Sequence, residues 1–222
     1  MIDKRLVAAA GFLVIAALAC GGGGTSGGPT STPAPKTLFK DDFSSERNGW
    51  GTGDDETASL QYTDDKYVFK ILQTDWFIWG NPDQDDFSNI HFQVTAQNVG
   101  DATDPTFGVI CNYQSKDAFY YLGIGPDGYY AIVRVDGEDD IFLTSDENLW
   151  ILSDKLEINA DQYVIDAGCG ADGTLTLTVN GQQIDSATDT TYTQGNIGLF
   201  ALSFEETPVE IHFDDVQVTE LK

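Results

Sequence analysis

Two acidic stretches of the chain hold the residue types needed for general acid–base chemistry. They are GEDDIF (137–142) and FEETPVEIHFDD (204–215). On a β-strand, carboxyl groups at alternate positions project from the same face and can act on one substrate. In the first stretch Glu138 and Asp140 are two apart, but the stretch follows a turn signal. In the second, Pro208 interrupts the strand between the acids. Both stretches are more typical of acidic turns than of a catalytic pair.

Nucleophilic and phosphate-binding motifs are not found in the sequence. The two histidines, His91 and His212, each stand at an alternate position of an expected strand, which favours a satisfied or surface side chain over a catalytic base. The sequence has no G-x-S-x-G or H-E-x-x-H pattern, and its GIGPDG stretch (123–128) is not followed by a helix. The sequence therefore favours binding over catalysis.

Aromatic side chains are the best candidates for ligand contacts, and we expect them at Trp76, Trp79, Tyr121 and Tyr130. Sugar rings have apolar C–H faces that pack against Trp and Tyr. Tyr121 and Tyr130 each follow another tyrosine, and adjacent strand residues face opposite ways, so only one ring of each pair can meet a ligand. Core packing is the alternative for every one of these rings.

The N-terminal residues resemble an export signal. Lys4 and Arg5 precede the uncharged residues 6–19, a run too short to span a bilayer as a helix. The end of the run, ALAC (17–20), resembles the lipobox of bacterial lipoproteins, in which a lipid is attached to the cysteine. We therefore predict a signal peptide over 1–19, lipidation at Cys20, and a Gly/Ser/Pro-rich tether over 20–36. Ordinary cleavage of a signal peptide is the alternative.

The remaining two cysteines, Cys111 and Cys169, form an even pair in a domain that we expect to be exported. Such pairs are typically oxidised, so a disulfide between them is predicted, with two buried free thiols as the alternative.

The charge balance limits the kinds of partner. The chain has 36 acidic and 11 basic residues, a formal net charge of −25. Because this surface repels phosphate backbones and anionic headgroups, nucleic acid is excluded as a partner, and contact with a membrane is expected through the lipid alone.

Period-2 alternation of apolar residues recurs through the rest of the chain. Turn signals such as Asn180-Gly181 separate the alternating segments, and this pair predicts a type I′ hairpin. The pattern predicts an all-β domain over 37–222, built as a two-sheet antiparallel jelly-roll sandwich. One short helix is expected over 153–159. The segments with the clearest alternation are 67–72, 90–96, 106–113, 129–135, 174–179, 196–202 and 209–218.

Several segments resemble concanavalin A-like, laminin-G-type jelly-roll domains of exported bacterial proteins, a group related to 3-keto-disaccharide hydrolase-like domains. They are KDDFSSERNGW (40–50), 107–137, 169–184 and 195–218. The resemblance implies paired terminal strands. It also implies a structural Ca²⁺ beside them, for which the candidate ligands are Asp41, Asp42, Asp214 and Asp215.

Laminarinase-type relatives in this group carry an E-x-D-x-(x)-E pattern, which neither acidic stretch matches. We therefore expect an exported, lipid-anchored, non-catalytic module that binds extracellular carbohydrate, at the cell surface or in the periplasm. The alternatives are a sugar-cleaving enzyme of the 3-keto-disaccharide hydrolase type and an adhesion or structural domain with a protein partner.

Overall fold

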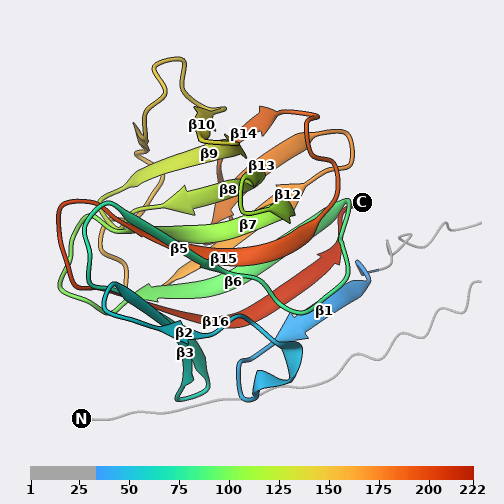
Figure 1. Cartoon of the computed structure of the whole chain (residues 1–222). Coiled ribbons are helices and arrows are strands. Elements are labelled where there is room, and N and C mark those ends of the chain that lie inside the picture. The colour runs from blue at the N-terminus through green and yellow to red at the C-terminus, as the bar shows by residue number, and fades with distance from the viewer. Residues whose placement is uncertain (1–33) are drawn as a thin grey trace, which may run out of the picture. The chain divides into compact units, whose positions relative to one another are not determined.

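Two antiparallel β-sheets lie face to face in the computed structural model, which describes residues 34–222 (Figure 1). Cys20 and the predicted signal peptide and tether up to residue 33 lie outside the described residues. This arrangement confirms the predicted all-β jelly-roll sandwich. The larger, nine-stranded sheet has the order β14 (Gln182–Thr188), β13 (Thr174–Val179), β12 (Tyr163–Cys169), β6 (Ile90–Asn98), β16 (Val209–Glu220), β4 (Lys66–Ile71), β3 (Ala58–Thr63) and β2 (Gly53–Asp54), with β1 (Thr37–Asp41) paired to β16.

The second sheet has seven strands and carries the candidate site. Its order is β10 (Asp139–Phe142), β9 (Tyr129–Asp136), β8 (Ala118–Ile124), β7 (Thr106–Ser115), β15 (Asn196–Ser203) and β5 (Trp76–Gly80), with β11 (Ile151–Leu152) paired to β9. A long loop connects β10 to β11 and rises at the top of Figure 1.

The main core fills the space between the sheets. β6 illustrates why: Ile90, Phe92 and Val94 are fully buried on its inner face, whereas the intervening His91 is half-buried on the outer one. Burying each such side chain contributes about 1.5–3 kcal/mol. Alternating apolar residues thus hold the two layers together.

A disulfide between Cys111 on β7 and Cys169 on β12 joins the two sheets through this core, as predicted from the cysteine count. Both cysteines are fully buried.

Two further local predictions are confirmed. Asn180 and Gly181 have φ values of 51° and 79°, the positive values that a type I′ hairpin requires, and they join β13 to β14. The terminal strands β1 and β16 pair, with Asp41 opposite Val216.

The helix predicted over 153–159 is wrong, because these residues form turns. The amides of Ser153 and Asn159 donate to the carbonyls of Gly128 and Pro126, so these backbone groups bond to the β8–β9 turn and not in a helical pattern. Asn159 also has a φ of 53°, which ends any helical turn. In residues 34–222 the one helical segment is a 3₁₀ turn at Glu46–Asn48, and none is long and apolar enough to cross a bilayer.

Candidate functional site

The outer face of the seven-stranded sheet carries a cluster of aromatic rings. Alternation along β8 sends Tyr120 and Leu122 into the inter-sheet core and turns Phe119 and Tyr121 outward. Rings from β5, β7, β10, β15 and the loop before β11 join them. We call this set of eight rings the aromatic face: Phe77, Trp79, Tyr113, Phe119, Tyr121, Phe142, Trp150 and Phe200.

The aromatic face has two layers. Phe119, Tyr121 and Phe200 are almost completely buried at its base, while the other five rings are half-buried above and around them. Phe77 stacks on Phe200 with ring centroids 5.1 Å apart, and Trp79 lies 5.9 Å from Phe77. The partly exposed upper rings are the surfaces that a ligand can contact.

Trp150 connects the aromatic face to a pocket at one end of the sheet. Its ring centroid is 6.3 Å from that of Tyr121 on the face and 6.2 Å from that of Phe204, which lies just beyond β15. The pocket has a volume of about 290 Å³, near the lower end of the range for ligand sites. We call it the end pocket, and its lining residues are Asp104, Thr106, Asp127, Tyr129, Trp150, Phe204 and Glu205.

Three carboxyl groups line the end pocket. Asp104 accepts a hydrogen bond from the Glu205 amide through Oδ2 at 3.0 Å, while its Oδ1 is buried without a partner. Asp127 accepts from the Tyr129 amide at 3.3 Å, and Glu205 is exposed. None of the lining residues is a Lys or Arg.

A fourth carboxyl group lies at the β10 edge of the aromatic face. Asp140 accepts a hydrogen bond of 3.3 Å from the Tyr121 hydroxyl. Partial burial against the sheet raises the pKa of Asp140 from its ordinary value, and the Tyr121 hydrogen bond acts in the opposite direction.

The four aromatic residues predicted from the sequence lie in three different places. Trp79 and Tyr121 belong to the aromatic face. Trp76 is 38% exposed but outside it, since it alternates with Phe77 along β5. Tyr130 lies in the inter-sheet core, 7% exposed, and donates from its hydroxyl to Asp185 Oδ2 at 2.7 Å. Packing therefore leaves Tyr130 no free ring face for a ligand.

Sequence reasoning missed Trp150, Phe204 and the end-pocket acids. These residues lie outside the long alternating strands, in loops or at strand ends, where periodicity carries no information. The one available signal was a tryptophan at the end of the polar stretch TSDENLW (144–150).

The four aspartates predicted to bind calcium have different environments. Asp41 is buried and accepts from the Phe43 amide and from Trp50 Nε1, both at 2.9 Å. Asp214 accepts from Lys66 Nζ at 2.7 Å. Asp42 and Asp215 line one surface pocket, and Asp41, Lys40 and Arg47 line the same pocket. In residues 34–222 no cluster of three or more His, Cys, Asp or Glu is placed to hold a metal ion.

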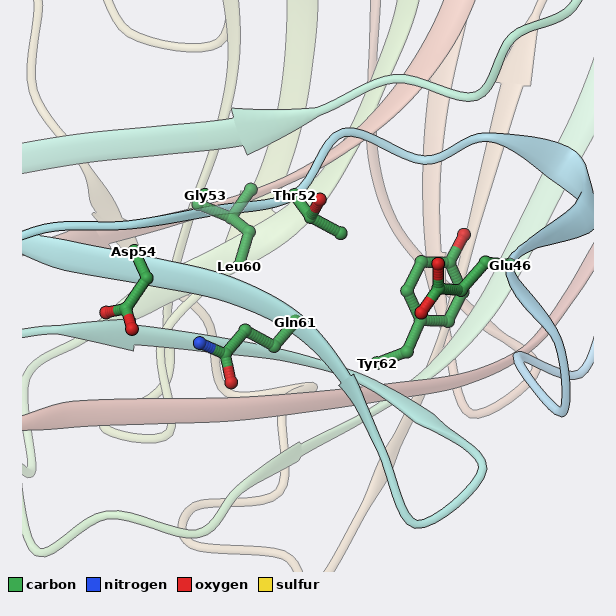
Figure 2. A pocket seen from close by; sticks show the side chains of 7 residues that line it. All are labelled: Glu46, Thr52, Gly53, Asp54, Leu60, Gln61 and Tyr62. Carbon is green, nitrogen blue, oxygen red and sulfur yellow. The ribbon is translucent and has the colours of Figure 1, made fainter.

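A third pocket lies at the β2–β3 edge of the larger sheet and has a volume of about 390 Å³ (Figure 2). Figure 2 shows Glu46 beside the Tyr62 ring at one end and Asp54 near Gln61 at the other. The Tyr62 oxygen accepts a hydrogen bond from the Trp50 amide. Tyr62 supplies the single ring of this pocket, whereas eight rings form the aromatic face, so the aromatic face is the stronger candidate site.

Two antiparallel sheets with paired terminal strands form a concanavalin A-like jelly-roll sandwich. The structure is similar to the carbohydrate-binding module CBM66 from Bacillus subtilis, with a TM-score of 0.60 and 10% identity over 78% of this chain and 96% of that one. It is also similar to a Bacillus subtilis protein with a galectin-like fold (0.59, 12%, 83% and 96%) and to a Bacillus licheniformis beta-glucanase (0.57, 11%, 85% and 100%).

No protein-family profile matches the sequence, and neither does any curated protein. At the identities above, the likeness to solved structures shows the fold alone.

Proposed function

We propose that the domain binds carbohydrate on the aromatic face, without cleaving it. The observation that carries this proposal is the continuity of the rings: they extend across the outer face of one sheet from Trp79 and Tyr113 to Trp150, where the end pocket begins. A sugar chain laid along this surface stacks the apolar C–H faces of successive rings on the half-buried aromatics. Its hydroxyl groups then reach the carboxylates of Asp140 and the end pocket.

The fold supports this proposal. Similar solved structures include a carbohydrate-binding module and beta-glucanases. The names of these proteins, which have the same fold, refer to carbohydrate. The identities of 10–12% leave the ligand to be argued from this chain's own residues.

We also propose that the protein is exported and held at a bacterial membrane by a lipid on Cys20, with residues 21–36 as a tether. The pattern of the first 20 residues and the disulfide support export. Metabolic labelling with a radioactive fatty acid tests this: labelled protein is expected from the natural chain and none from Cys20→Ala.

The binding proposal is tested by titrating purified full-length protein with a panel of soluble oligosaccharides in a calorimeter. Saturable binding of at least one oligosaccharide is expected. The proposal is contradicted if no neutral, acidic or amino sugar of the panel gives binding heat or changes the tryptophan fluorescence of the protein.

A second candidate function is cleavage of a glycosidic bond, and Asp140 is the observation that favours it. Asp140 lies beside an aromatic surface, and its pKa is raised from the ordinary value, which is the direction of shift that a general acid needs. Release of reducing ends that disappears in Asp140→Asn, while oligosaccharide binding persists, is the result that favours this function over binding alone.

A further inference from the structure

The end pocket combines aromatic rings with carboxyl groups, and both kinds of group attract a cation. Tyr129, Trp150 and Phe204 place aromatic rings around it, and Asp104, Asp127 and Glu205 place carboxyl groups there. Rings that surround a small volume attract a cation through their negatively charged faces, and carboxylates attract the same cation directly.

The rings are held firmly enough to form such walls. Trp150 packs edge-on against Phe204 and Phe142, with centroid distances of 6.2 and 5.9 Å, and nearly parallel to Tyr121. Tyr129 is 42% exposed at the start of β9. A fixed tryptophan and an exposed tyrosine thus leave ring surface for a ligand.

The carboxylates of the pocket are only partly paired. Asp104 Oδ1 has no hydrogen-bond partner, and Asp127 is half-buried with one backbone amide as its donor. Glu205 is exposed, and no lysine or arginine lines the pocket to neutralise these charges. The pocket therefore favours a ligand that brings N–H donors and a positive charge.

We propose that the end pocket binds a protonated amine, and that this amine belongs to a deacetylated amino sugar within the glycan. The inference rests on the proposed function, because Trp150 belongs both to the end pocket and to the aromatic face. One sugar chain can therefore stack on the face while an amine at its end enters the pocket. An acetylated amine has lost its charge and some of its donors, and a uronic acid is repelled by the three carboxylates.

The test is a calorimetric titration of full-length protein with three β-1,4-linked hexamers, of glucosamine, N-acetylglucosamine and glucose. We expect the glucosamine hexamer to bind about tenfold more tightly than the other two, which corresponds to about 1.4 kcal/mol. This advantage should shrink as salt is raised from 50 to 500 mM, since the attraction is electrostatic.

Matched variants test whether the preference for the glucosamine hexamer depends on the end pocket. Glu205→Gln and Tyr129→Ala change exposed residues of the pocket and should reduce the advantage of the glucosamine hexamer at least threefold. Glu56→Gln removes the same charge at an exposed position outside the pocket and should leave the advantage intact. Equal losses in Glu205→Gln and Glu56→Gln mean that the overall charge attracts the ligand, which overturns the assignment to the pocket.

The remaining outcomes separate this inference from the proposed function. Equal affinity for the three hexamers, or a preference for the acetylated one, overturns the amine pocket and leaves carbohydrate binding in place. Failure of every hexamer and of the oligosaccharide panel overturns both. Choline tests whether the pocket binds a small ammonium compound that is not a sugar. Saturable choline binding without any hexamer binding overturns the assignment to an amino sugar.

Discussion

Asp41 Oδ2 accepts a hydrogen bond of 2.9 Å from the indole Nε1 of Trp50, and both side chains are buried. The carboxylate on β1 thereby fixes the tryptophan that follows the 3₁₀ turn. Asp41→Ala leaves the indole N–H without its partner and should lower the free energy of unfolding by about 1–3 kcal/mol in urea denaturation. Asp86→Ala, at an exposed loop position, is the control and should unfold like the natural chain. Equal stability of all three proteins contradicts a structural role for Asp41.

The disulfide between Cys111 and Cys169 should make a large contribution to stability. The two cysteines are 58 residues apart, and in the chain-entropy model closing a loop of that length stabilises by up to about 4 kcal/mol. Replacing both cysteines by alanine should lower the free energy of unfolding by several kcal/mol in urea. A loss below about 1 kcal/mol contradicts this expectation.

Glu210 should make stability depend on pH below about 4.5. Hydrogen bonds from Lys70 and then His212 hold the pKa of Glu210 below its ordinary value of 4.5. A carboxylate with a depressed pKa stabilises the fold above the unfolded pKa, and this contribution is lost as pH falls through the folded value. Urea unfolding between pH 3 and 6 should therefore show a smaller loss of stability towards acid in Glu210→Gln than in the natural chain. Parallel curves for the two proteins contradict the assignment.

Calcium at the terminal strands stays a prediction. Asp41 and Asp214 already bind Trp50 and Lys66, and Lys40 and Arg47 line the pocket of Asp42 and Asp215. If Ca²⁺ adds to these contacts, a chelator should lower the midpoint of thermal unfolding, and added Ca²⁺ should restore it. An unchanged midpoint contradicts the calcium prediction.

The fold could be predicted from the sequence because its signals are local and repeated. Strict alternation, as in TLTLTV (174–179), together with Asn180-Gly181, defines strands and a hairpin with few competing structures. The segment 153–159 was predicted wrongly because its hydrogen bonds go to a distant turn, at Pro126 and Gly128, which no local pattern reveals.

The candidate site was less predictable because it depends on which face of a strand each ring occupies and on which loops meet. Trp76 and Trp79 are three residues apart on one strand, yet only Trp79 joins the aromatic face. Tyr121 and Tyr130 have similar sequence contexts and pack on opposite sides of the same sheet. Trp150, Asp104 and Phe204 converge from three segments well separated in the sequence, so their proximity is a product of topology.

Comparison of Trp79→Ala with Trp76→Ala tests the central claim most directly. Both substitutions remove a tryptophan from β5, but only Trp79 contributes to the aromatic face. With the best oligosaccharide of the panel, calorimetry should show affinity reduced at least tenfold in Trp79→Ala and unchanged in Trp76→Ala. Far-ultraviolet circular dichroism and urea unfolding verify that both variants are folded. Undiminished binding by folded Trp79→Ala, or an equal loss in Trp76→Ala, contradicts carbohydrate binding on this face.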